Sequence, residues 1–253
     1  MKKKIILVTG DPNSINSELI FKCWKKLSKK VKKNLFLVSN YRLLKEQFKK
    51  LKYKTSVISA NFNQKHSSSD KIKIINVNLK FKNPFKVSKK SSSKFVIQSL
   101  KVAHKLALDE KVAGLINCPI DKKLLNKKET GVTEFLASMC KIKKKSGVMV
   151  IMNNNLIVSP ITNHLDIRSI AKNINKDLIV NKVKIINNWF KKSFIKKPKI
   201  GILGLNPHNA EFRTDSEENR IIRPAIKKLI KYGIKVKGPL VSDTLFINNY
   251  KNF

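Results

Sequence analysis

Short apolar runs alternate along the chain with segments in which apolar residues recur every three or four positions. Short β-rich runs are typical of strands, and the wider spacing is typical of helices with one buried face. Their alternation predicts an α/β fold built on a mostly parallel sheet. Strands are expected at residues 5–9, 35–39, 72–77, 112–116 and 199–205, and a hairpin at 148–152 and 156–161. Helices are expected at residues 17–32, 41–51, 94–108, 133–140, 166–172, 177–192 and 217–232, with polar connections at 60–71 and 83–94.

Two histidines directly follow apolar runs. Residues 156–161 lead into Thr162-Asn163-His164, and residues 199–205 lead into Asn206-Pro207-His208. If both runs are neighbouring parallel strands, the two imidazoles lie outside carboxyl ends of the sheet, where α/β proteins bind ligands. A neutral imidazole there can bind a divalent metal ion. We therefore expect a shared metal site, although either ring could instead hydrogen-bond a loop.

Other polar residues with chemical potential gather in loops that follow a predicted strand or precede a predicted helix. Thr133 stands at the start of a helix, where its hydroxyl and the free backbone N–H groups could hold a phosphate. It could equally be only an N-cap. Asp243 could ligate a metal, act as a base or cap a turn, and Lys122 could neutralise an anion. The loops concerned are residues 10–18, 117–122, 130–134 and 206–218.

The remaining histidines and the cysteines carry weaker signals. His104 falls inside a predicted helix, so we expect a surface or packing role, and His66 lies in a polar loop. Cys23, Cys118 and Cys140 are an odd number without a CxxC pair, which favours reduced thiols in a cytoplasmic protein over a disulfide or a cysteine zinc site.

Composition limits the class of protein. With 253 residues and 42% apolar residues, the chain can form one large α/β domain or two smaller ones. No apolar stretch approaches the ~20 residues of a membrane span, and the apolar run after Lys2-Lys3-Lys4 is too short for a signal peptide. We expect no membrane partner.

The formal net charge of +39 raises the question of nucleic-acid binding. The basic residues are 50 lysines and five arginines, although arginine is the preferred fork for phosphates and base edges. The lysines are also spread over every predicted helix. We therefore expect a solvated basic surface without a specific nucleic-acid partner, and non-specific binding to polyanions at low salt.

Nucleotide-binding signatures are absent from the sequence. No G-x-G-x-x-G follows the first predicted strand, and there is no P-loop. A nicotinamide cofactor would therefore need a different binding architecture.

A series of short motifs resembles, in order along the chain, the 4-hydroxythreonine-4-phosphate dehydrogenase family (PdxA) of vitamin B6 biosynthesis. The most specific part is Gly204-Leu205-Asn206-Pro207-His208-Asn209-Ala210-Glu211, followed by Glu217-Glu218 and Ile222-Arg223-Pro224-Ala225. The other matches are Gly10-Asp11-Pro12 with Glu18, Asn117-Cys118-Pro119-Ile120-Asp121-Lys122, Gly131-Val132-Thr133-Glu134, Thr162-Asn163-His164, and Gly238-Pro239 with Asp243-Thr244-Leu245-Phe246.

The resemblance implies a two-domain α/β fold similar to isocitrate and isopropylmalate dehydrogenases, with domains at residues 1–127 and 128–253, working as a cytoplasmic homodimer with its site at the subunit interface. It implies NAD (or NADP) bound without a Rossmann loop and a divalent metal (Zn, Mg or Co) held by three histidines. His164 and His208 match two of these ligands, Thr133 and Val132 match substrate contacts, and Asp243 is the catalytic candidate. The implied substrate is 4-phosphooxy-L-threonine. Its oxidation gives a β-keto acid that loses CO₂ to form 3-amino-2-oxopropyl phosphate.

Several positions depart from the family pattern. Val132 stands where the family has histidine, residues 13–17 replace a Gly/Pro-rich pattern, and residues 212–216 replace a Gly-rich stretch that is one residue longer. The family also continues beyond the position of Phe253 into a His-Asp-Gln segment with the third metal ligand. We therefore expect the fold to be incomplete at the C-terminus, and this chain to be inactive alone and poorly stable.

Two other functions stay open. The chain could be a metal-dependent dehydrogenase acting on another phosphorylated or acidic hydroxy-acid, as the loss of a polar contact at Val132 suggests. It could also be a non-catalytic or polyanion-binding protein that keeps the fold, as its charge and missing end suggest.

Overall fold

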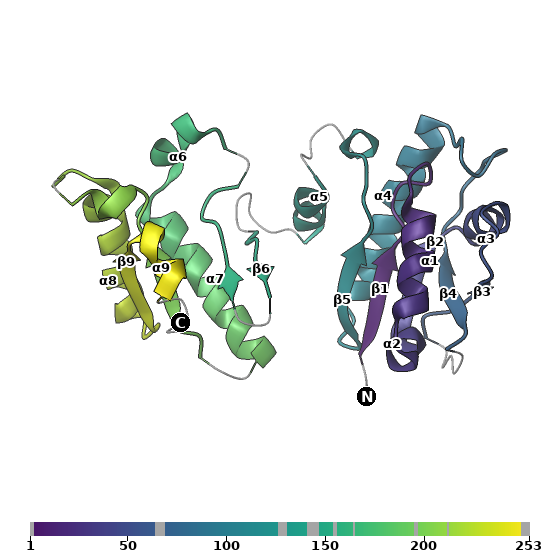
Figure 1. Ribbon diagram of the computed structural model, residues 1–253, viewed down its shortest axis with the longest axis horizontal. Coiled ribbons are helices and arrows are strands. Elements are labelled where there is room, and N and C mark those ends of the chain that lie inside the picture. Colours follow the sequence, from purple (N-terminus) through teal and green to yellow (C-terminus); the bar gives the residue numbers. More distant parts are fainter. Residues whose placement is uncertain are drawn as a thin grey trace. The chain divides into compact units, whose positions relative to one another are not determined.

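The computed structural model describes residues 3–63, 69–125, 131–140, 147–153, 156–163, 165–194, 197–211 and 213–248. The chain forms two compact units, Met1–Ile142 and Lys143–Phe253 (Figure 1). Among the described residues, no helix combines the length and hydropathy that crossing a membrane requires.

The first unit is built on a five-stranded parallel sheet, which confirms the predicted α/β class. The strand order is β3-β4-β2-β1-β5. The strands are β1 (Lys4–Val8), β2 (Leu35–Ser39), β3 (Ser56–Ser59), β4 (Lys71–Asn76) and β5 (Val112–Asn117). The helices are α1 (Asn16–Lys26), α2 (Lys29–Asn34), α3 (Tyr41–Lys50), α4 (Lys89–Ala107), the short 3-10 helix η1 (Lys122–Leu124) and α5 (Val132–Met139).

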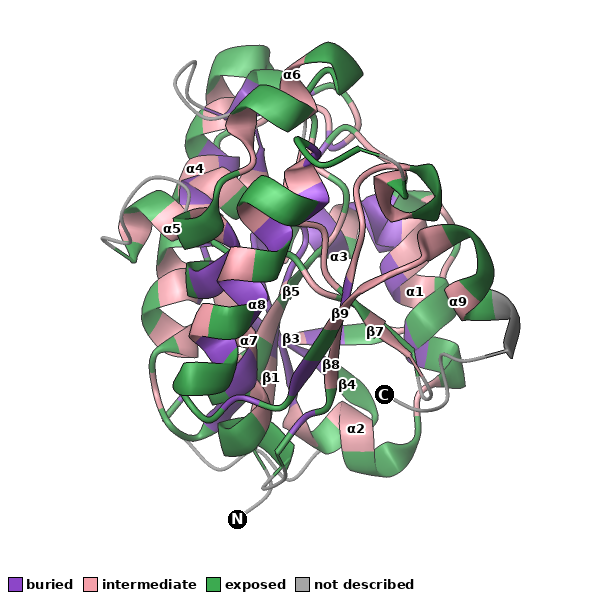
Figure 2. Cartoon of the chain, turned by 90° about the vertical axis from the view of Figure 1, so that its left-hand side faces the viewer, coloured by how far each residue is buried: buried purple, intermediate pink, exposed green. Residues whose placement is uncertain are grey.

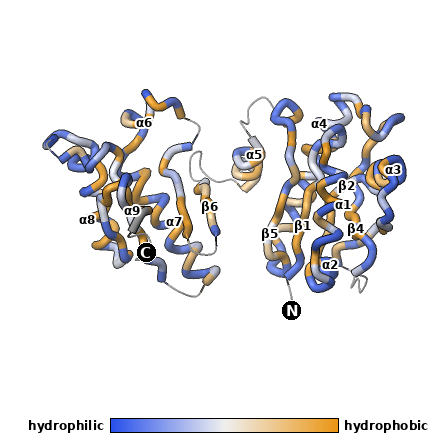
Figure 3. Tube along the Cα trace, viewed as in Figure 1, coloured by the Kyte–Doolittle hydropathy of each residue, from blue (hydrophilic) through white to orange (hydrophobic). Residues whose placement is uncertain are grey.

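Each face of this sheet carries its own apolar core. Successive strand side chains point to opposite faces, so that Ile6, Phe36 and Val38 pack with α4 and Phe135 of α5. The intervening residues, such as Leu37, pack with α1 and α3 on the other face. Figure 3 shows hydrophobic residues in orange along β1 and β5, whereas the lysine-rich α2 is blue. Burial on both faces explains why β2 is an uninterrupted apolar run.

The structure differs from the sequence prediction at three places in this unit. The helix expected at 17–32 is two helices, because the chain leaves helical geometry at Leu27 and Ser28 caps α2 by accepting a hydrogen bond from the N–H of Val31. Helix α4 begins at Lys89 inside the expected polar connection, because the hydroxyl of Ser88 caps it. Strand β3 was not predicted, since only one of its four residues is buried.

The second unit has smaller sheets than the first. It contains β6 (Ile151–Met152), β7 (Ile157–Val158), α6 (Ile167–Asn173), α7 (Lys176–Phe194), β8 (Ile200–Leu203), η2 (Pro207–Ala210), η3 (Glu218–Ile222), α8 (Arg223–Lys231), β9 (Val236–Leu240) and α9 (Ser242–Asn248). Its core joins α7, η3, α8, β8 and β9 through residues such as Ile179, Ile222 and Leu229. Figure 2 shows buried and exposed positions alternating along α7 and α8.

The strands of this unit correct one expectation. The hairpin is confirmed, since β6 and β7 pair antiparallel. The run 156–161 is therefore not a strand of a parallel sheet beside 199–205. Among the described residues, β8 pairs instead with β9, a strand that was not predicted. The expectation that the runs before His164 and His208 are neighbouring parallel strands is wrong for this reason, while His164 itself lies outside the described residues.

Two further details concern helix boundaries. Pro224 lies in the first turn of α8 directly after the π-helical turn η3. Proline lacks an N–H and clashes with the carbonyl four residues earlier, and a widened turn avoids both problems.

The domain division at 127 and 128 would assign α5 to the second domain, whereas Phe135 of this helix packs in a core of the first unit.

Candidate functional site

The clearest polar site of the second unit lies where β8 and β9 end. The two strands are parallel, with Leu203 opposite Leu240, and the N–H of Gly204 donates to the carbonyl of Leu240 at 2.9 Å. The turns after both strands therefore start from the same edge. His208 lies in η2 after β8, Asp243 lies in the first turn of α9 after β9, and the His208 N–H donates to Asp243 Oδ2 over a long 3.5 Å. The structure thus brings these two predicted site residues together.

Three consecutive residues in the turn after β8 have left-handed backbones. The φ angles are 49° at His208, 57° at Asn209 and 51° at Ala210. Residues other than glycine rarely adopt this conformation, which costs free energy and is found preferentially at functional sites. The imidazole of His208 is exposed on this turn. The rest of the unit must hold the strained turn in place.

The buried carboxylate of Glu218 holds that turn. Its Oε1 accepts hydrogen bonds from the N–H groups of Leu205 and Asn206, both at 2.8 Å, and its Oε2 accepts one from Asn206 Nδ2 at 3.0 Å. Burial alone would raise the pKa of Glu218, but these hydrogen bonds outweigh it and hold the pKa below its ordinary value. Glu217 also accepts from Asn206 Nδ2, and this hydrogen bond lowers its pKa.

Close packing fixes the same turn from the other side. A Cβ atom on Gly204 would lie 2.1 Å from Asn209 Oδ1, so no larger residue fits there without displacing Asn209. The amide of Asn209 donates to the carbonyl of Pro239 at 3.2 Å. Its Oδ1 is buried and has no hydrogen-bond partner among the described residues. An unpaired buried oxygen is costly, and a cation would be one way to satisfy it.

These residues fit part of a metal site. The imidazole nitrogen of His208 and the side-chain oxygens of Asp243 and Asn209 are of the donor types that Zn, Mg or Co bind, and the contact shown between them is that of the His208 backbone N–H with Asp243. In the described parts of the chain, no three His, Cys, Asp or Glu residues lie close enough to hold one ion. His164 lies outside the described residues. The neighbouring Asn163 also has a buried Oδ1 for which the described part of the chain provides no hydrogen-bond partner.

The first unit has its own group of predicted site loops, joined at the ends of β1 and β5. The side-chain amide of Asn16 donates to the carbonyl of Thr9 at 2.9 Å and of Pro119 at 2.8 Å. Gly10 has a φ of 74°, and a Cβ there would approach the Pro119 oxygen to 2.7 Å. Asn13, one of the departures from the family pattern, pairs with the backbone of Val87 through both ends of its carboxamide. Two of the four predicted loops are therefore in contact.

The start of α5 matches the predicted anion site in its backbone. The N-cap is Gly131, so the alternative in which Thr133 caps the helix is wrong. The N–H groups of Val132, Thr133 and Glu134 precede the first intrahelical bond, which runs from Phe135 to Gly131. The Thr133 side chain is exposed, while Val132 packs against the first core and offers no polar group. Lys122 is exposed in η1.

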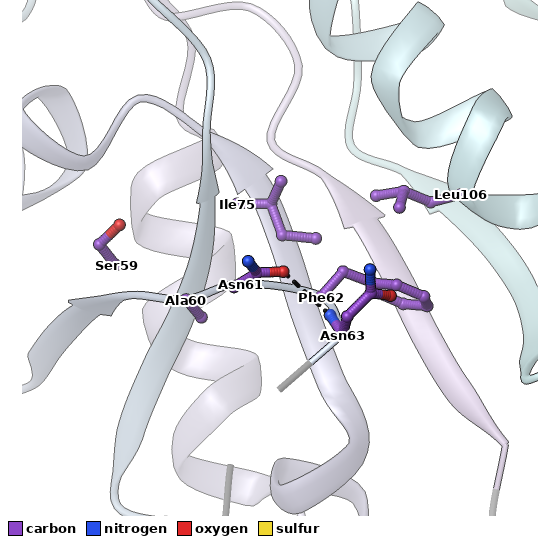
Figure 4. A pocket seen from close by; sticks show the side chains of 7 residues that line it. All are labelled: Ser59, Ala60, Asn61, Phe62, Asn63, Ile75 and Leu106. Carbon is purple, nitrogen blue, oxygen red and sulfur yellow. Dashed lines mark hydrogen bonds between the residues drawn. The ribbon is translucent and has the colours of Figure 1, made fainter. Parts of the chain in front are cut away.

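A hollow elsewhere on the first unit has the wrong chemistry for catalysis (Figure 4). Its volume is about 590 Å³, and its walls hold apolar side chains together with hydroxyl and carboxamide groups. The lining residues are Ser59, Ala60, Asn61, Phe62, Asn63, Ile75 and Leu106. None of these residues is titratable. The side chain of Asn61 is used to accept from the N–H of Asn63 at 3.0 Å.

Sequence reasoning did not assign a role to Glu218 or Asn209. Glu218 lies at the start of a predicted helix, and a glutamate at such a position is usually solvated. Its burial depends on the pairing of β8 with β9, which no local pattern predicted.

Comparison with known proteins identifies relatives along the whole chain. The sequence model of the family described as "Pyridoxal phosphate biosynthetic protein PdxA" matches residues 31–253. The chain is 36% identical over 259 residues to the 4-hydroxythreonine-4-phosphate dehydrogenase of Sulfurihydrogenibium sp., covering 99% of this chain and 77% of that protein. It is 31% identical to the protein of the same name from Aquifex aeolicus, covering 98% and 77%. The fold matches a crystal structure of a 4-hydroxythreonine-4-phosphate dehydrogenase from Burkholderia phymatum with a TM-score of 0.87 and 24% identity, covering 100% of this chain and 78% of that one.

Proposed function

Because the chain belongs to the PdxA family of pyridoxal phosphate biosynthetic proteins, we propose that it is an NAD-dependent dehydrogenase acting on 4-phosphooxy-L-threonine. The product would be 2-amino-3-oxo-4-phosphooxybutanoate, which decarboxylates to 3-amino-2-oxopropyl phosphate. When bound, a divalent cation supplies Lewis acidity and NAD (or NADP) supplies the hydride acceptor. We also propose an isocitrate dehydrogenase-like two-domain fold, a homodimer whose subunits share the site, and a cytoplasmic location.

The observation that carries the proposal is the turn at the end of β8. It combines an exposed imidazole, three left-handed residues and a buried carboxamide oxygen without a partner among the described residues, and the buried Glu218 holds the start of the turn at Leu205 and Asn206. Strain of this kind persists only where the surroundings enforce it, and it favours a binding role over a plain surface turn.

Each proposed residue has a defined task. His208, together with His164, would hold the cation, since neutral imidazole suits all three candidate metals. Asp243 stands beside the His208 backbone and is exposed, so its carboxylate can accept the proton of the substrate hydroxyl. Thr133 and the free N–H groups of α5 would hold the phosphate.

Metal binding tests the proposal without requiring turnover. Titration calorimetry with Zn²⁺ and Co²⁺ should show that His208→Asn weakens binding at least about tenfold, because an imidazole ligand is lost. Asparagine tolerates the left-handed backbone, so the turn should survive. His164→Asn should have a similar effect, and His104→Asn, a histidine of the other unit, should have none. Unchanged affinity in His208→Asn would refute the ligand assignment.

Turnover tests the reaction itself. In the full-length protein, NADH formation from 4-phosphooxy-L-threonine should stop on addition of a chelator and should fall strongly in Asp243→Asn, which keeps the shape of the side chain without its basicity. Chelator-resistant turnover would contradict the metal-dependent reaction.

The packing of Val132 in the first core favours one alternative, a dehydrogenase for another phosphorylated or acidic hydroxy-acid. Val132→His restores the polar group that the family has at this position. If 4-phosphooxy-L-threonine is the substrate, this variant should bind it at least as tightly as the wild type does. A wild type that oxidises only a different hydroxy-acid would establish the alternative.

A further inference from the structure

A cysteine and a histidine from different helices meet on the first unit, outside both groups of site residues. His104 lies in the last turns of α4, and Cys140 is the C-cap residue of α5. His104 Nε2 lies 3.2 Å from Cys140 Sγ, although the two residues are 36 positions apart in sequence. This is hydrogen-bond distance for a sulfur atom.

The contact has the geometry that activates a thiol. A ring nitrogen without a hydrogen can accept the thiol proton, and the thiolate that remains is the nucleophilic form of cysteine. Cys140 is exposed, so reagents can reach the sulfur. The carbonyl end of α5 disfavours a negative charge at this position, and the imidazole of His104 is the neighbouring base that can accept the proton. Lys101, exposed one turn before His104 on α4, adds positive charge to the same helix.

The other two thiols provide internal references. Burial raises the pKa of Cys118 to about 11, so this thiol stays protonated. Cys23 is exposed like Cys140, but its sulfur has no hydrogen-bond partner among the described residues. Cys140 therefore has an imidazole beside it, whereas Cys23 lies inside α1 and its charge acts on the thiol of Cys118.

We propose that the His104–Cys140 pair is a site of covalent thiol modification by low-molecular-weight disulfides. His104 takes the thiol proton, and Cys140 Sγ attacks one sulfur of the disulfide R–S–S–R. A new S–S bond forms between Cys140 and one half of the reagent while the original S–S bond breaks. The other half leaves as R–S⁻ and receives the proton from His104, so that one disulfide is exchanged for another and no further oxidant is needed.

The test is site-resolved reactivity toward oxidised glutathione. The folded protein is incubated with the reagent and quenched with acid, and the extent of modification at each cysteine is measured by peptide mass spectrometry over time. Cys140 should react about tenfold faster than Cys23, and Cys118 should react most slowly. Iodoacetamide, a neutral alkylating reagent, should give the same order.

A matched variant separates activation from exposure. His104→Gln keeps a polar side chain on α4 but removes the imidazole that acts as the base. The rate of modification at Cys140 should therefore fall to within about twofold of the rate at Cys23. The rate at Cys23 should not change, and far-ultraviolet circular dichroism should match the wild type. If His104→Gln unfolds α5, His104→Asn replaces it in the same measurement. Cys140→Ser is then added, and its total extent of modification is compared with that of the wild type. Equal rates at Cys140 and Cys23 in the wild type, or an unchanged rate at Cys140 in a folded His104 variant, would overturn the proposal.

Discussion

Among the described residues, each unit of the chain buries one charged side chain at zero exposure, and the two side chains have different partners. In the first unit Lys73 lies on β4, and its Nζ donates to the carbonyls of Lys32 and Lys33 at the end of α2, at 2.7 and 3.1 Å. In the second unit Glu218 accepts from the backbone of the turn that carries His208. The lysine binds carbonyls at a helix end near solvent, whereas the glutamate binds the N–H groups of Leu205 and Asn206, for which the described residues provide no other acceptor.

This difference indicates which interactions hold the loops of each unit in position. The first unit has five parallel strands with a core on each face, so the sheet itself defines the positions of its loops. In the parts of the second unit that the structure describes, the sheets are the two-stranded pairs β6–β7 and β8–β9 beside one core, and a polar network holds the turn after β8. We therefore expect polar substitutions to matter most in the second unit.

The largest expected effect is that of Glu218→Ala. It leaves the N–H groups of Leu205 and Asn206 buried without an acceptor, at a cost of roughly 3 kcal/mol in the free energy of unfolding of this unit. Glu218→Gln keeps one acceptor oxygen and should lose less than half as much. Denaturant titration monitored by circular dichroism, with hydrogen exchange to locate the change, measures both. Equal stability of the alanine variant and the wild type would show that the carboxylate does not hold the turn.

A pair of glycine substitutions sharpens the comparison. Gly204→Ala places a Cβ 2.1 Å from Asn209 Oδ1 and should destabilise the second unit by about 1–3 kcal/mol while weakening metal binding. Gly114→Ala on β5 of the first unit meets nothing within 4 Å and should stabilise by about 0.5 kcal/mol. Thermal unfolding and calorimetric metal titration distinguish the two. A tolerated alanine at 204 would mean that the turn adapts easily.

The third expected effect is smaller. Lys73→Met removes two hydrogen bonds but also relieves the burial of a charge, so we expect a change within about 1 kcal/mol. The carbonyls of Lys32 and Lys33 lie at the end of α2 and can turn to water. A loss as large as that of Glu218→Ala, measured by the same denaturant titration, would remove the contrast between the units.

The pH dependence of the same two groups gives the smallest effects, and they lie at opposite ends of the pH scale. The pKa of Glu218 is lowered in the folded state, so its stabilisation is present above the ordinary glutamate pKa of about 4.3 and is lost as the pH falls further. Burial lowers the pKa of Lys73, so stability should rise as the pH increases from that lowered pKa towards about 10.4. Difference curves between the wild type and Glu218→Gln or Lys73→Met isolate each group.

Much of the first unit could be predicted from the sequence because its elements have strong local patterns. Residues 35–39 are an apolar run and form β2, and residues 41–51 have helical spacing and form α3 almost throughout. The elements that the sequence did not predict contain many polar residues. Strand β3 is mostly solvated, and the Ser-rich start of α4 has the composition of a loop, although Ser88 caps the helix there.

The candidate site was predictable only in part. His208 and Asp243 could each be singled out, but their proximity depends on the pairing of β8 with β9, and Gly238-Pro239 inside β9 reads as a turn. The close approach of the two strands explains the glycine, since a Cβ at Gly238 would lie 2.4 Å from the carbonyl oxygen of Ile202. Tertiary pairing of this kind overrides the local turn signal.

The parallel pairing of β8 and β9 also sets where this chain can change length. The strands fix a common origin for the turns that carry His208 and Asp243, so one inserted residue between Leu203 and His208, or between Leu240 and Asp243, would shift one turn against the other. Residues 213–215 are exposed and lie after the left-handed run, outside that interval. Insertions and deletions should accumulate there during evolution, while both spacings at the strand ends stay constant.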